Sequence, residues 1–116
     1  MHDYHKLLVW QKALAFVLDI YKLTKKFPKE ELFGLISQLR RAAVSVMANV
    51  VEGRGKQTDK DFIRYLYISK GSLNECQCYL ELAVGLLYIT QQELDRQLQR
   101  VREIGFLLNK LIESLS

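Results

Sequence analysis

The chain has 116 residues, of which 49% are apolar and 26% charged, with a net charge of +4, one proline and six glycines. This length suits one domain with a real core, and the composition excludes a disordered or collagen-like chain. No apolar run free of charge reaches the length of a membrane span, and no cleavable leader pattern follows Met1. We therefore expect a single cytoplasmic domain over residues 1–116, without a membrane partner.

The first half of the chain predicts two helices. The first runs from about Tyr4 to Phe27 and stops before Pro28, whose ring disfavours a helical residue in front of it. The second begins near Lys29 or Leu35 and ends at Glu52, where Gly53-Arg54-Gly55 supplies a permissive C-terminal stop.

The second half predicts two more helices. One begins after Thr58, with Asp61 completing an imperfect capping box, and continues to about Tyr88. The other begins after Thr90, which forms a proper capping box with Glu93, and runs to the C-terminus. No segment shows strand-like alternation. Because the connections are short, we expect an all-α, up-down-up-down antiparallel four-helix bundle.

Three of these helices are more apolar than a solitary bundle requires. Their narrow polar faces leave apolar surface that needs a partner. On the second helix this surplus comprises residues that lie away from the predicted core line: Val44, Met47, Ala48 and Val51. The pattern predicts a symmetric homo-oligomer.

A polar stripe follows the second helix at spacings of three, four, four and three residues: Gln38, Arg41, Ser45, Asn49 and Glu52. Polar groups flanked by alanines are shielded from water and need partners. Ser72 and Glu75 of the third helix are the candidates, and an Arg41–Glu75 ion pair fits the expected register. We favour a structural network over the alternative, in which the stripe binds a ligand.

Enzyme chemistry has little support in the sequence. Cys76 and Cys78 fit no disulfide or metal pattern and are predicted to be buried structural thiols. His2 and His5 flank Asp3 at the N-terminus, where a solvated end is a commoner explanation than a metal site. The Gly53-Arg54-Gly55-Lys56 turn is a weak candidate for phosphate binding. We predict no catalytic residue, metal or cofactor.

Positive charge gathers in two places, which the bundle would put at opposite ends. The first group is Lys22, Lys25, Lys26 and Lys29; the second is Arg54, Lys56, Lys60 and Arg64. A basic end can engage a phosphate backbone without reading sequence. Ordinary solvated helix ends are the alternative explanation, and core packing explains Tyr65 and Tyr67 near the second group as well as base stacking does.

Several motifs resemble the four-helix-bundle proteins first noted as products of 23S rRNA intervening sequences. The matching stretches cover most of the chain: Leu8 to Ala13, Phe27-Pro28 with Glu31, Gly34-Leu35, Gln38 to Ser45, Asn49, Glu52-Gly53, and Gly71 to Leu73 with Glu75. The resemblance implies a homopentameric ring and no catalytic residues. A related branch, the accessory proteins of diversity-generating retroelements, binds nucleic acid and a reverse transcriptase.

Two functions follow from these observations. The first is a non-enzymatic oligomeric scaffold that binds structured RNA or DNA through its basic ends, which a ring would multiply into basic rims. The alternative is a protein-interaction module that docks on a polymerase, reverse transcriptase or ribosomal component without direct contact to nucleic acid.

Overall fold

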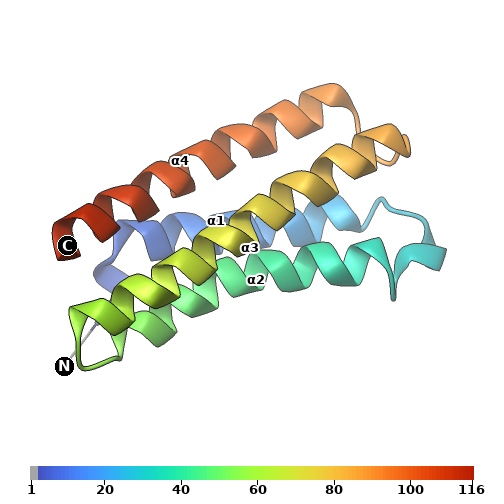
Figure 1. Cartoon of the computed structure of the whole chain (residues 1–116). Coiled ribbons are helices and arrows are strands. Elements are labelled where there is room, and N and C mark those ends of the chain that lie inside the picture. Colours follow the sequence, from blue (N-terminus) through green and yellow to red (C-terminus); the bar gives the residue numbers. More distant parts are fainter. Residues whose placement is uncertain (1–2) are drawn as a thin grey trace.

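The computed structural model describes residues 3–116 and is all-α over that range (Figure 1). Its four long helices are α1 (Leu8–Thr24), α2 (Leu35–Arg54), α3 (Asp59–Gly85) and α4 (Gln91–Leu115). Two single turns of 3-10 helix, η1 (Tyr4–Lys6) and η2 (Lys29–Glu31), precede α1 and α2. The predicted four helices are confirmed. None of the described helices is long and apolar enough to cross a membrane.

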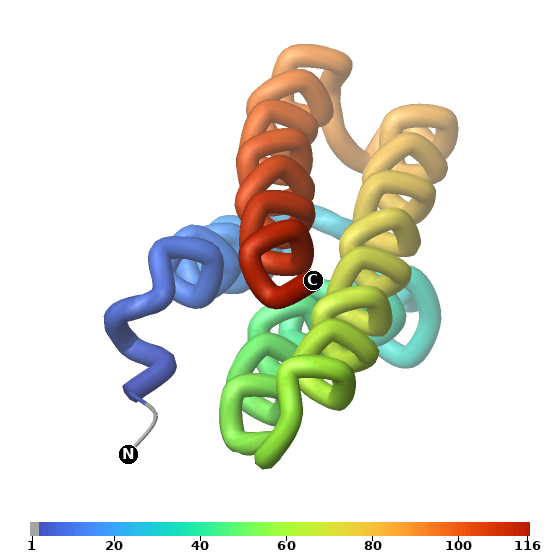
Figure 2. The backbone as a smooth tube through the Cα atoms, turned by 60° about the vertical axis from the view of Figure 1, so that its left-hand side comes forward, coloured from blue at the N-terminus to red at the C-terminus, as the bar shows by residue number. Residues whose placement is uncertain are grey.

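Each helix packs against the helix that follows it in the chain, and the contact between α2 and α3 is the most extensive. In that contact the Ser69 hydroxyl donates to the Val46 carbonyl oxygen at 2.7 Å. Helix α4 runs beside α3 (Figure 2) and also meets α1, where Lys12 is 3.5 Å from Glu103 and Asp19 is 2.8 Å from Arg100.

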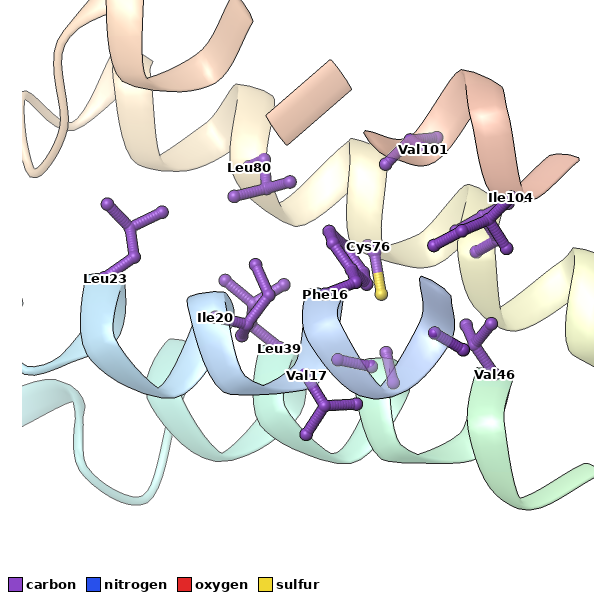
Figure 3. Packing of buried hydrophobic residues seen from close by; sticks show 14 of the residues in the cluster. Phe16, Val17, Ile20, Leu23, Leu39, Val46, Cys76, Leu80, Val101 and Ile104 are labelled. Carbon is purple, nitrogen blue, oxygen red and sulfur yellow. The ribbon is translucent and has the colours of Figure 1, made fainter. Parts of the chain in front are cut away.

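All four helices contribute to one apolar core (Figure 3). Phe16 and Ile20 of α1 are fully buried with Leu39 of α2 and Leu80 of α3, and α4 adds Ile104. This shared core stabilises the helices, since most of the stability of a helix in a protein comes from the packing of its apolar face.

Both predicted capping signals act at helix starts. The Thr58 hydroxyl oxygen accepts a hydrogen bond from the Asp61 N–H at 3.1 Å, and Thr90 with Glu93 forms the full reciprocal capping box that begins α4. These caps satisfy N–H groups that have no partner within the helix.

Several helix limits differ from the prediction, and α1 begins at Leu8 rather than about Tyr4, after the separate turn η1. α1 ends at Thr24 rather than Phe27, and α3 ends at Gly85 rather than Tyr88. At the end of α3, Leu87 adopts a left-handed conformation with φ 65°. The N–H groups of Leu87 and Tyr88 turn back to the carbonyls of Val84 and Ala83, a Schellman ending that glycine normally provides.

α2 ends within the predicted Gly53-Arg54-Gly55 stop, at Arg54 with Gly55 as the C-cap, so Gly53 itself is still helical. It is buried against α3. A Cβ at this position would lie 2.8 Å from both Phe62 Cδ1 and Tyr65 Cβ. Glycine is therefore required here by the close approach of two helices, not by a turn.

Candidate nucleic-acid interface

The middle of the polar stripe joins α2 to α3. The hydroxyl oxygens of Ser45 and Ser72 are 2.8 Å apart, and Asn49 Nδ2 donates to the Ser45 carbonyl and hydroxyl oxygens at 2.8 and 2.9 Å. Ser72 is buried, and the other two side chains are half-buried. These contacts pair polar groups that would otherwise be costly to bury.

The ends of the stripe lie in solvent, which the sequence did not indicate. Gln38, Arg41 and Glu52 are exposed. Arg41 and Glu75 line one open hollow, yet no ion pair joins them within residues 3–116. The expected Arg41–Glu75 pair is therefore not formed; at an exposed site, water offsets most of what such a pair would gain.

The first basic group lies at the end of the bundle where α1 stops. Lys26 is paired with Glu93 of α4, and this contact lowers the pKa of the Glu93 carboxyl. Lys22, Lys25 and Lys29 are exposed and form no ion pair in the described part of the chain. Three of the four cations at this end are thus not neutralised by a neighbouring carboxylate.

Arg40 of α2 joins this end, and the sequence did not single it out. Its guanidinium carbon lies 4.5 Å from the centre of the Tyr21 ring, Nε donates to Thr24 Oγ1 at 2.8 Å, and a terminal nitrogen donates to the Tyr21 carbonyl at 3.3 Å. These three contacts hold the guanidinium in one orientation. Two of its five N–H groups are used, and the others remain for a ligand.

A pocket of about 360 Å³ opens between α1, η2 and α2 at the same end. Its apolar surface comes from Phe27, Leu32 and Ile36. Lys25, Lys29 and Arg40 also line it, together with the buried side chain of Thr24. No carboxylate lines the pocket, so its charge favours an anion.

A neighbouring hollow between α1 and α4 has a mixed charge. Lys22, Lys26 and Arg96 line it together with Asp19 and Glu93. Asp19 is paired with Arg100, and Glu93 with Lys26. Because the carboxylates face the same space as the cations, this hollow is less suited to phosphate than the pocket beside Arg40.

The second basic group lies around the α2–α3 turn, where Lys56 and Arg64 already have partners. Lys56 Nζ lies 3.8 Å from Glu52 Oε1 and 5.2 Å from the centre of the Tyr65 ring. The Arg64 guanidinium lies 4.6 Å from the same centre, while Lys60 is exposed and Arg54 Nε is buried without a partner.

The glycine turn at this second end does not form the phosphate site that its sequence suggested. The N–H groups of Gly55 and Lys56 are bonded to the carbonyls of Val51 and Gly53. The first turn of α3 begins with Asp59 and Asp61, whose charges disfavour a second anion. The donors are therefore occupied and the local charge is unfavourable.

The cysteines and the N-terminal histidine give no catalytic arrangement. Cys76 is buried, which raises the pKa of its thiol to about 12, but Cys78 is exposed, contrary to prediction. His5 Nδ1 lies 2.8 Å from Asp3 Oδ1, and His2 lies outside the described residues. Residues 3–116 contain no cluster of three or more potential metal ligands among His, Cys, Asp and Glu.

Comparisons with known proteins identify relatives across nearly the whole chain. Residues 5–110 match the model of a family described as 23S rRNA-intervening sequence protein. A crystal structure of a protein of unknown function, from the S23 ribosomal protein family of Bacteroides thetaiotaomicron, is 31% identical with a TM-score of 0.83; the match covers 90% of this chain and 98% of that one. No curated protein matches the chain.

Proposed function

Because the chain belongs to the family of 23S rRNA-intervening sequence proteins, we propose that it is a non-enzymatic scaffold that binds nucleic acid. In this proposal the protomer is an up-down-up-down bundle, assembles with itself into a ring, and engages RNA or DNA through the end that carries Lys22, Lys25 and Lys29. The observation that carries the proposal is that Lys25, Lys29 and Arg40 line one pocket at that end, which no carboxylate lines. The pentameric number of subunits comes from the family resemblance alone.

Self-association is supported by the outer surface of α3. Ile68, Leu82 and Leu86 are exposed along this surface. Between Ile68 and Leu82, Gly71 faces open space, since a Cβ added there would meet nothing within 4 Å. Glycine in a helix interior costs about 1 kcal/mol relative to alanine. Packing inside the protomer does not require this glycine, whereas close approach of a second helix to this face would.

Light scattering at micromolar concentration tests the assembly. We expect a mass several times that of the 13.6 kDa chain. Leu82→Glu should reduce this mass, because it places a charge on the apolar face of α3. Gln92→Glu, at an exposed polar position of α4, is the matched control and should leave the mass unchanged. A monomeric wild-type chain would contradict the ring.

Nucleic-acid binding is supported by the excess of positive charge around the pocket at the first end. Lys25, Lys29 and Arg40 surround a space with no carboxylate. Each phosphate that they neutralise would release counterions, which makes the affinity sequence-tolerant and strongly salt-dependent. A ring would bring several copies of this end to one rim and thereby raise the avidity.

A salt titration of binding tests this function. Fluorescence anisotropy with labelled RNA and DNA should show binding at about 50 mM salt, with an affinity that falls steeply as salt increases. Absence of binding to single-stranded and duplex probes at about 50 mM salt would remove the nucleic-acid proposal, because phosphate contacts are strong under those conditions.

A docking role is favoured by a different observation at the same end. Phe33 and Leu87 are 93% and 88% exposed. They lie in neighbouring segments, since Tyr88 Oη donates to Glu31 Oε2 at 2.8 Å. Large exposed apolar side chains of this kind fit a protein partner such as a polymerase, reverse transcriptase or ribosomal component. In that case Phe33→Ser with Leu87→Ser would abolish capture of the partner and leave nucleic-acid affinity unchanged.

A further inference from the structure

We infer that the pocket between α1, η2 and α2 holds an unpaired nucleotide of a single strand, with the base on the apolar surface and the phosphate against the cations. This inference rests on the proposed nucleic-acid function and specifies its ligand. It concerns seven lining residues: Thr24, Lys25, Phe27, Lys29, Leu32, Ile36 and Arg40.

The apolar part of the pocket indicates the base. Phe27 and Ile36 are almost fully buried, whereas Leu32 is half-exposed and forms the accessible wall. Phosphate alone gains nothing from such a surface. A duplex keeps its bases stacked inside, whereas a single strand can place a base against apolar or aromatic side chains. The pocket, of about 360 Å³, lies near the lower end of the usual range for small-molecule sites, roughly 300–1,000 Å³.

The orientation of Arg40 indicates the phosphate. Its guanidinium is fixed against the Tyr21 ring and Thr24 Oγ1, so little side-chain freedom remains to be lost on binding. A planar guanidinium matches the geometry of a phosphate better than an ammonium group does. Lys25 and Lys29 add exposed charges on the same rim.

The two acidic residues of η2, Glu30 and Glu31, do not line the pocket. Glu31 of η2 accepts hydrogen bonds from Tyr88 Oη at 2.8 Å and from the Leu35 N–H at 3.1 Å, and it does not line the pocket. By contrast, Asp19 and Glu93 line the neighbouring hollow. The pocket beside Arg40 therefore combines positive charge with apolar surface, and this combination suits a nucleotide.

Three probes of equal length test this inference on the full chain by fluorescence anisotropy at about 50 mM salt. They are a single-stranded oligonucleotide, the same sequence as a blunt duplex, and an abasic strand that keeps the sugar–phosphate chain. We expect the single strand to bind roughly fivefold more tightly than the other two, because a base placed against Leu32 takes apolar surface out of water. This comparison uses the wild-type chain and does not depend on a variant that folds.

A variant pair then locates the effect. Leu32→Ser should remove most of the preference for the single strand and leave duplex affinity unchanged. Leu18→Ser is the control: Leu18 is an exposed leucine of α1 that does not line the pocket. This variant should leave all three affinities unchanged. Equal binding of the three probes would overturn the inference while the proposed function stands. Failure of all three probes to bind would remove both.

Discussion

The two basic groups each comprise four Lys or Arg residues, but the surroundings of these side chains differ. At the first end, Lys25 and Lys29 border an apolar pocket without a carboxylate. At the second, Lys56 and Arg64 lie over the Tyr65 ring, and Lys56 is also close to Glu52. A cluster of lysines and arginines therefore does not by itself define an interface. What the fold places opposite the cations decides whether they can receive a ligand.

The largest effect should come from reversing charge at the first end. Lys25→Glu with Lys29→Glu should lower the affinity for a single-stranded oligonucleotide by about 100-fold at about 50 mM salt, because two phosphate contacts become repulsions. Lys56→Glu with Lys60→Glu is the matched variant at the second end and should change the affinity by less than about threefold. Anisotropy measures both. Equal losses would abolish the distinction between the ends.

A second prediction concerns the structural role of the second end. Gly53→Ala should lower the free energy of unfolding by about 1–3 kcal/mol, because the added methyl group overpacks a close helix contact. Gly55→Ala is the control: its Cβ would lie 3.7 Å from the Glu52 carbonyl oxygen, an ordinary contact. Urea unfolding followed by circular dichroism measures both. Unchanged stability of Gly53→Ala would contradict the close-approach explanation.

A smaller effect is expected from Arg40→Lys, which keeps the charge but loses the planar fork. The affinity for the single strand should fall by about three- to tenfold, whereas the slope of affinity against salt should stay nearly constant. Arg41→Lys changes the neighbouring, exposed arginine. It should leave both the affinity and the salt slope unchanged. If the two variants behave alike, the orientation of Arg40 makes no contribution.

The smallest effect concerns pH at the first end. Hydrogen bonds from Tyr88 and then from the Leu35 N–H lower the pKa of the Glu31 carboxyl. Because the folded pKa lies below the unfolded one, this contribution to stability is complete above about pH 4.3. It is lost as the pH falls through the folded value. Thermal unfolding between about pH 3 and 6 should show a shallower pH dependence for Glu31→Gln; an identical dependence would contradict this assignment.

The parts of the fold that the sequence predicted correctly depend on local signals. The two threonine caps and the apolar periodicity are readable from neighbouring residues, so the four helices and the starts of α3 and α4 were expected. The end of α3 was missed because Leu87 occupies a conformation that glycine normally adopts. The sequence did not show why position 53 must be glycine, because the reason is its close contact with Phe62 and Tyr65 of α3.

The candidate interface was predicted only in part for the same reason. The sequence identified the lysines around residue 25, since charge can be counted along the chain. It could not identify Arg40, because its orientation depends on Tyr21 and Thr24 of another helix. The Arg41–Glu75 pair was expected because the two residues lie at the same level of adjacent helices. That level does not show whether two exposed side chains point toward each other or into the solvent.

We propose that nucleic acid binds at the first end and not at the second. Photo-crosslinking of a single-stranded oligonucleotide containing 4-thiouridine, followed by mass spectrometry of the peptides, distinguishes the two ends. We expect crosslinks to Tyr21 and to the segment from Phe27 to Leu32, which disappear in the Lys25→Glu, Lys29→Glu variant. Crosslinks confined to Tyr65 and Tyr67 would contradict it.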